Sequence, residues 1–142
     1  VGRRRVAVLV LDSEAVSALA RPRVDPSRHI AVRAAMRSAH SRNAPIRIPA
    51  AALVELYRGR GTDEAIDGVL ARGFAQVVTT GARMARVAGH LLANVGAGSE
   101  LAIDALVVAT AIRFGGGIIA TDDPDDLRRL ATSHPNVAIL EI

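Results

Sequence analysis

Runs of consecutive aliphatic residues alternate along the chain with stretches whose apolar residues recur every three to four positions. The first pattern is typical of strands buried on both faces of a parallel sheet, and the second of helices that cover such a sheet. Strands are predicted at 5–11, 46–48, 74–78, 118–121 and 137–140. Helices are predicted at 13–20, 28–42, 49–58, 62–72, 81–95, 101–114 and 123–130. Short strands interleaved with helices predict an α/β domain with a parallel sheet.

Local signals set the expected helix ends. Ser27 can cap the second helix, Pro49 suits the first turn of the third, and Ser99 can cap the long apolar helix that follows the glycines at 96–98. Gly73 ends the helix before it. The apolar stripe expected on the second helix consists of Ile30, Ala34, Ala35 and Ala39.

The domain organisation predicted from length and loops is a single domain over residues 1–142. That length fits one compact domain, and no repeat, linker or low-complexity tract interrupts it. Half of the residues are hydrophobic, but only one Tyr and two Phe are present, so the core must be aliphatic. We therefore expect an ordered domain, because a disordered chain lacks the apolar surface that offsets the entropy of ordering.

The membrane and export signals that a sequence can carry are weak here. The apolar run 6–11 is much shorter than the ~20 residues that span a membrane, and it ends on Asp12 without a small-residue cleavage pattern. Cysteine is absent, which excludes disulfides, thiolate metal sites and cysteine nucleophiles. We expect a soluble, cytoplasmic protein.

The net charge is +4, and every cationic side chain is Arg. Arginine binds phosphate in a bidentate manner, which suits a nucleic-acid partner. A GC-rich genome yields the same bias without functional meaning, so the excess permits an RNA partner without requiring one. Arg3 to Arg5 are open to both interpretations, as phosphate contacts or as part of a solvated surface.

Acidic residues follow two of the predicted strands. Asp12 comes directly after the first strand, and Asp123 lies in an acid-rich segment at 121–126 after the fourth. In open α/β sheets, ligands bind at the carboxyl ends of the strands. Helix capping explains Asp12 equally well, and one or two of the later acids. It does not explain four carboxylates within five residues, whose repulsion a bound cation would offset.

Two further acids lie among apolar residues of predicted helices. Glu55 has an alternative interpretation as a surface residue paired with Arg58. Asp104 is harder to explain in this way, because its helix is apolar almost all round and Asp has poor helix propensity. A buried carboxylate is normally paired, metal-bound or facing a cavity. Asp104 is therefore a candidate functional residue.

Carboxylates without cysteine favour a hard, oxygen-ligated cation, Mg²⁺ or Mn²⁺ rather than zinc. The histidines at 29, 40, 90 and 134 have no metal-ligand spacing and are interpreted as surface or capping residues.

The ordered set of acids resembles the PIN-domain ribonuclease family along the whole chain. The resemblance is carried by Asp12-Ser13 after the first strand, Glu55 after the second, Asp104-Ala105 in a late helix, and the closing segment 121–127. It implies a three-layer fold with a five-stranded parallel sheet in the order 3-2-1-4-5. By this resemblance the metal ligands and catalytic residues are Asp12, Glu55, Asp104 and Asp123, supported by Ser13, Thr121 and Asp126.

One position departs from the family pattern. Many relatives have Asn two residues after the first Asp, whereas this chain has Glu14. The substitution either changes the local hydrogen bonding or adds a fifth acid to the site.

The resemblance also implies an activity and partners. The function expected is an endoribonuclease that hydrolyses RNA phosphodiester bonds with Mg²⁺ or Mn²⁺. The size of the chain is similar to VapC-type toxins of toxin–antitoxin pairs. Such a toxin is neutralised by a VapB-like antitoxin, commonly dimerises, and forms a larger toxin–antitoxin assembly.

Three alternatives remain at this point. A haloacid-dehalogenase-like phosphatase would use Asp12 and Glu14 with Asp122 and Asp123, but the lysine of that family is missing and Asp104 stays unexplained. A receiver-type phosphoacceptor also needs a lysine. A catalytically inactive PIN-fold binding module is disfavoured by the intact set of acids.

Overall fold

A five-stranded parallel sheet forms the centre of the protein, with strand order β3-β2-β1-β4-β5. The computed structural model describes residues 7–142. The strands are β1 (Val8–Leu11), β2 (Ile46–Pro49), β3 (Gln76–Val78), β4 (Gly117–Thr121) and β5 (Val137–Glu141). This confirms the predicted fold class and strand order. The predicted first strand began at residue 5, and positions 5 and 6, like the arginines at 3–5, lie outside the described residues.

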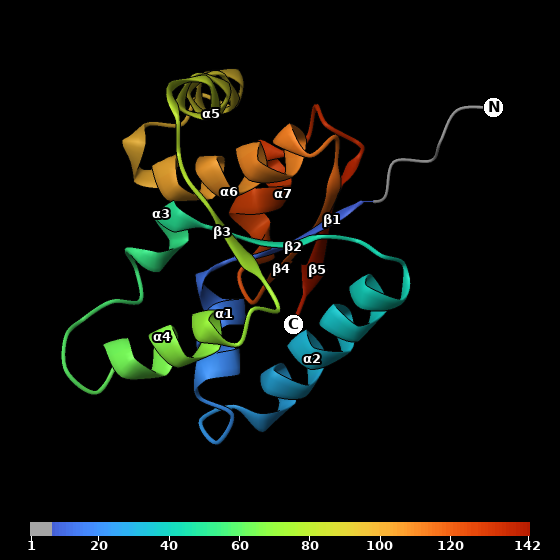
Figure 1. The fold of residues 1–142 in the computed structure, drawn as a ribbon. Coiled ribbons are helices and arrows are strands. Elements are labelled where there is room, and N and C mark those ends of the chain that lie inside the picture. Colours follow the sequence, from blue (N-terminus) through green and yellow to red (C-terminus); the bar gives the residue numbers. More distant parts are fainter. Residues whose placement is uncertain (1–6) are drawn as a thin grey trace.

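Helices cover both faces of the sheet, which gives three layers (Figure 1). The helical elements are α1 (Ser13–Ala20), α2 (Pro26–Ser41), α3 (Ala50–Leu53), α4 (Asp63–Ala71), α5 (Ala82–Asn94), the short 3₁₀ turn η1 (Ser99–Leu101), α6 (Ala102–Arg113) and α7 (Pro124–Leu130). Helices α1, α2 and α4 lie on one face, whereas α5, α6 and α7 lie on the other (Figure 1).

The residues of β1 alternate between two hydrophobic clusters. Val8 and Val10 pack with the α5–α6–α7 side, whereas Leu9 and Leu11 pack with the α1–α2–α4 side. Successive side chains of a strand point to opposite faces, so a continuous aliphatic strand serves two cores at once. The pattern of β1 is therefore the sequence signal of its central position.

The central pair of strands approaches closely at a glycine. Gly117 pairs with Val8, and a Cβ atom at position 117 would lie 2.2 Å from the Val8 carbonyl oxygen. The predicted fourth strand began one residue later, because glycine was counted as a break. Here Gly117 belongs to the strand because only glycine allows this approach. The pairing brings the carboxyl ends of β1 and β4 together.

The start of α2 differs from the prediction. The helix begins at Pro26, and the carboxylate of Asp25, not the Ser27 hydroxyl, accepts a hydrogen bond from the Arg28 amide at 3.1 Å. Proline at the first helical position moves the cap back by two residues. The predicted apolar stripe was also partly wrong, because Ile30 is 64% exposed whereas Ala39 is buried.

The segment around Glu55 also differs. Pro49 is the last residue of β2 and α3 ends at Leu53, so Glu55 lies in the turns that follow and not within a helix. The extended backbone of Pro49, with ψ at 129°, keeps it in the strand. At α6, a 3₁₀ turn replaces the predicted side-chain cap by Ser99. No helix in the described part of the chain is long and apolar enough to cross a membrane.

Candidate active site

Asp12 lies at the carboxyl end of β1 and is only 6% exposed. Its Oδ1 accepts a hydrogen bond from the Ala15 amide at 3.2 Å, so it caps α1. Burial raises the pKa of Asp12 to about 9, and a hydrogen bond and repulsion from Glu14 act in the same direction. The Thr121 hydroxyl and the Ala15 amide oppose this rise. The capping interpretation of Asp12 is therefore confirmed, whereas its buried carboxylate is not among the residues that line the pocket described below.

Ser13 forms side-chain hydrogen bonds with both Glu14 and Glu55. The Ser13 hydroxyl donates to Glu14 Oε2 at 3.1 Å, and hydrogen bonding to Ser13 also lowers the pKa of Glu55. Burial and then repulsion from Glu14 raise the pKa of Glu55 above its usual value. The Arg58 guanidinium donates to the carbonyl groups of Val54 and Tyr57 at 2.7 and 2.8 Å. Glu55 is exposed and the charge of Arg58 lowers its pKa, so the surface alternative holds in part, but partial burial and repulsion from Glu14 outweigh Arg58.

Asp104 joins the same group of charges from the first turn of α6. Burial raises the pKa of Asp104 to about 6. Repulsion from other carboxylates adds to the effect, in the order Asp126, Glu55, Glu14 and Asp123. These acids come from three other parts of the chain, and each is close enough to Asp104 to disfavour its charged form. The fold therefore brings Glu55, Asp123 and Asp126 close to Asp104, and Asp12 is connected to this group through Glu14.

Thr121, Asp122 and Asp123 connect the end of β4 to α7. Thr121 is buried, and its Oγ1 accepts a hydrogen bond from the Asp123 amide at 3.0 Å. Asp123 occupies the N-cap position of α7 but makes no side-chain capping bond, so its carboxylate remains exposed. Asp122, the neighbouring acid, contacts Arg28 with 2.9 Å between Oδ2 and Nη1. Because it makes no capping bond, the Asp123 carboxylate is available to a ligand.

A pocket of about 310 Å³ opens beside these residues. Its charged lining consists of Glu14, Asp25, Glu55 and Asp122, together with Arg21 and Arg28. We call it the acidic pocket. It lies where the carboxyl ends of β2 and β4 meet the beginnings of α1 and α2, which is the location that open parallel sheets use for ligands.

The chemistry of the donors fits a hard divalent cation. Carboxylates that raise one another's pKa store repulsion that a dication would remove, and oxygen is the ligand that Mg²⁺ and Mn²⁺ prefer. Within residues 7–142, no three carboxylate or histidine side chains are already arranged to enclose an ion. The residues that fit a metal by chemistry and location are Asp12, Glu55, Asp104 and Asp123, with Glu14 beside them.

Sequence reasoning missed part of this region. Arg28 and Asp25 were assigned no role, and Asp122 was considered only for the phosphatase alternative. The sequence signal for Asp25 was the Asp-Pro pair that commonly begins a helix. No sequence signal joins Arg28 to Asp122, because the two residues are distant in the chain. Glu14 was left open, and here it raises the pKa of Asp12, Glu55, Asp104 and Asp122.

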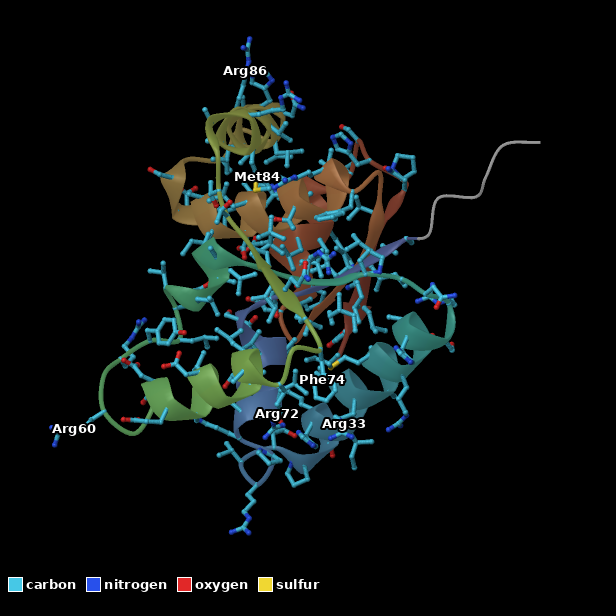
Figure 2. The ribbon with its side chains drawn as sticks, viewed as in Figure 1. Arg33, Arg60, Arg72, Phe74, Met84 and Arg86 are labelled. Carbon is cyan, nitrogen blue, oxygen red and sulfur yellow. The ribbon has the colours of Figure 1, made fainter. Side chains whose placement is uncertain are left out.

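A second cavity, of about 650 Å³, lies between α2, α4 and the β2–β3 side of the sheet. Its apolar lining includes Leu19, Met36, Ile48, Val69 and Phe74, and its cationic lining consists of Arg33, Arg37, His40 and Arg72. We call it the apolar groove. Figure 2 shows Phe74 near Arg33 and Arg72 on this side of the molecule. Phe74 is 64% exposed and lies before β3, which begins at Gln76, two residues later than predicted.

Comparison with known proteins supports the family assignment. A family model described as the PIN domain matches residues 9–132, which includes all of the acids described above. The chain belongs to the PIN domain family. PIN domains are generally nucleases and typically use divalent metal ions. The phosphatase and receiver alternatives are left without support.

A solved structure has the same fold. It is the crystal structure of VapBC2 from Rickettsia felis bound to a DNA fragment from its promoter, with a TM-score of 0.62 and 14% sequence identity. The match covers 95% of this PIN domain chain and 98% of the matched chain. At this identity the likeness concerns the fold. A comparison with curated protein sequences finds no match.

Proposed function

We propose that this PIN domain is a metal-dependent endoribonuclease. The observation that carries the proposal is the convergence on Asp104, whose pKa is raised by burial and by carboxylates that follow β1, β2 and β4. A fold that only needed stability would separate such charges, because each repulsion disfavours the folded state. The choice of RNA over DNA follows from the family resemblance, and Mg²⁺ or Mn²⁺ from the oxygen-only donors.

The residues proposed to hold the cation are Asp12, Glu55, Asp104 and Asp123. Asp12 is fixed by its capping bond to Ala15, and the Thr121 hydroxyl holds the backbone of Asp123 in place. Ser13 orients Glu14 and Glu55 through its hydrogen bonds, and Asp126 adds negative charge beside Asp104. A bound divalent cation would polarise the phosphodiester and lower the pKa of a water molecule.

We further propose that the protein acts as a VapC-type toxin neutralised by a VapB-like antitoxin. The fold likeness to a VapBC2 chain supports this assignment. The apolar groove supports it as well, because an apolar surface edged by Arg33, Arg37 and Arg72 suits an amphipathic protein segment with acidic side chains. Cleavage of cellular RNA would take place in the cytoplasm. The homodimer that the resemblance implies is testable by sedimentation of the purified protein.

The decisive experiment is cleavage of total cellular RNA by purified protein with Mg²⁺, with Mn²⁺ and with EDTA. We expect cleavage with either metal and none with EDTA. Asp104→Asn is the matched variant, because it keeps the shape of the side chain and removes its charge. If folded wild-type protein leaves RNA intact with both metals, or if Asp104→Asn cleaves as fast as wild type, the proposal is wrong and the inactive-module alternative gains support.

The toxin assignment has its own test in cells. Induced expression of the wild-type protein should arrest growth, whereas Asp104→Asn at the same level should not. Co-expression of a VapB-like protein encoded beside this gene should restore growth. Normal growth with abundant, folded and RNA-cleaving protein would separate the nuclease from the toxin and count against the latter.

A further inference from the structure

The acidic pocket presents an electrostatic problem to the substrate proposed above. An RNA strand carries a negative charge at every phosphate, and the pocket is lined by Glu14, Asp25, Glu55 and Asp122. A bound cation would offset part of this charge at the cleaved bond only. Flanking phosphates would still approach carboxylates at short range, where repulsion is strong. Some cationic side chain must therefore receive the strand as it enters.

Arg28 is placed for that task. It lines the acidic pocket, and its Nη1 lies 2.9 Å from Asp122 Oδ2 and 3.4 Å from Asp25 Oδ2. Its side chain remains 42% exposed, so it can be reached by a ligand without unfolding. A guanidinium has five N–H donors, more than these contacts occupy, and its planar fork matches the oxygens of a phosphate.

The position of Arg28 is fixed from two directions. Asp25 Oδ1 accepts a hydrogen bond from the Arg28 amide at 3.1 Å, and its other oxygen contacts the same residue's guanidinium. Asp122, at the end of β4, then holds the guanidinium over the pocket. Arg28 is therefore already oriented, unlike a free surface arginine, and loses little conformational freedom on binding.

The other arginine of the pocket is less constrained. Arg21 lies at the end of α1 and is exposed, and no ion pair involving it is found among residues 7–142. It can add to the local positive charge without setting a position. The two arginines thus differ in preorganisation, and Arg28 is the one that bridges α2 to the strand end beside Asp123.

We propose that Arg28, held by Asp25 and Asp122, binds an RNA phosphate next to the cleaved bond. This inference rests on the proposed function, since it assumes that RNA enters the acidic pocket. Arg28 then acts in binding and register and takes no part in the hydrolysis itself. Its loss should raise KM and leave kcat nearly unchanged, because a contact kept throughout the reaction stabilises ground state and transition state alike.

The first measurement separates binding from cleavage. A fluorescent single-stranded RNA is titrated with Asp104→Asn protein, which is blocked in cleavage, and with the double variant that also carries Arg28→Ala. We expect Kd to rise about tenfold and the slope of log Kd against log salt to fall by about 0.7, the value for one phosphate contact on a single strand. Arg28→Lys should recover part of the affinity, because it keeps the charge and loses the fork.

The control is Arg86→Ala. Arg86 is an exposed arginine of α5, and it points away from the body of the protein on the side remote from α1 and α2 (Figure 2). This variant should leave Kd and the salt slope unchanged, so a difference between the two arginines excludes a mere effect of net charge. Melting temperatures of all variants should be similar, because the Arg28 ion pairs are partly exposed and contribute little stability.

The outcomes distinguish the inference from the function on which it rests. If wild type cleaves RNA and Arg28→Ala changes neither KM, Kd nor the salt slope, the inference is overturned and the nuclease stands. If wild type does not cleave but binds RNA through Arg28, the nuclease falls and the binding role stands. If wild type neither binds nor cleaves RNA, both are wrong. A kcat loss as large as that of Asp104→Asn would also overturn the inference, because it would make Arg28 part of the chemistry.

Discussion

The acidic pocket and the apolar groove are formed by the same two helices with opposite chemistry. One side of α1, from Ser13 to Ala18, and the start of α2 at Arg28 line the acidic pocket. Leu19 of α1 and the later residues of α2, including Met36, line the apolar groove. The pocket holds carboxylates with raised pKa values, whereas the groove has an apolar floor and a cationic edge without any acidic lining residue.

We interpret this difference as two tasks carried out by the same pair of helices. Side chains at the carboxyl ends of parallel strands face a crevice that suits small polar ligands. Side chains nearer the middle of the sheet must pack, so a gap left between α2 and α4 is apolar and suits another protein. A cation and a phosphate fit the first region, and a partner segment fits the second. Variants that change only one of the two regions test this separation.

The largest effect is expected for a change at Asp104, among the carboxylates beside the acidic pocket. Asp104→Asn should lower the rate of RNA cleavage by about a thousandfold or more, because it removes a carboxylate proposed to bind the metal. Gel-based cleavage rates at saturating Mn²⁺ measure the effect. Affinity for the antitoxin, which we assign to the apolar groove, should stay within about twofold. A variant that lost both properties would show that the two regions act as one.

A smaller and complementary effect is expected at the apolar groove. Phe74→Asp should weaken antitoxin binding by about tenfold to a hundredfold, because it places a charge on an apolar contact surface. Since Phe74 is 64% exposed, the fold should tolerate the change. Val24→Asp is the matched control, because Val24 is 76% exposed but lines the acidic pocket. Calorimetric titration should find weaker binding for Phe74→Asp alone; equal losses in both variants would contradict the separation.

The stability of the metal-free protein should depend on pH through Asp12. Its pKa is raised to about 9 in the folded state, so between its usual value and about 9 the folded protein binds more protons than the unfolded chain. The free energy of unfolding should therefore fall as pH rises through this window. Asp12→Asn, which can still cap α1, should be about 1–2 kcal/mol more stable than wild type at pH 8 without metal.

Urea unfolding at several pH values measures this effect. Added Mg²⁺ should stabilise wild type and reverse its disadvantage against Asp12→Asn, because a ligand that binds only the folded state raises stability. Phe74→Asp, which leaves the acidic pocket unchanged, should keep the wild-type dependence on pH. Stability of metal-free wild type that rose steadily from pH 5 to 8 would contradict the assignment to Asp12.

The smallest effect is expected for Glu14→Asn. Repulsion from Glu14 raises the pKa of Asp104. Removal of the Glu14 charge should therefore lower the pKa of Asp104 from about 6. The acidic limb of the pH–rate profile should therefore move to lower pH, and only slightly because Asp126 and Glu55 act on Asp104 more strongly, with a change of only a few-fold at pH 8. Glu64→Gln on exposed α4 is a suitable control. An unchanged acidic limb would mean that Glu14 lies apart from the titrating group.

Much of the fold could be predicted from hydrophobic pattern. The aliphatic runs identified all five strands, and α1 begins and ends where the sequence predicted. The strand order came from the family resemblance, because periodicity does not say which strands are neighbours. Errors occurred where one residue has two possible roles: Gly117 can break or join a strand, and Pro49 can end a strand or open a helix.

The acids could be proposed from the sequence because their type was at odds with their surroundings, as Asp104 was in an apolar helix. The rest of the two regions could not be. Arg28 is an ordinary helix residue until β4 places Asp122 beside it. The apolar groove is a gap between α2 and α4, and no pattern in the sequence predicts a gap between two helices. Such features depend on packing between distant segments, which local patterns do not encode.

The parallel pairing of β1 with β4 has a consequence for how the protein is made. Asp12 leaves the ribosome long before Thr121 and Asp123 are added, and β1 stays without its neighbour β4 until then. Contacts between distant segments form late in folding. The carboxylates can therefore come together only after the segment that follows β4 has been translated. The nuclease proposed above would in this way be harmless to the messenger and ribosome while β4 is still being made.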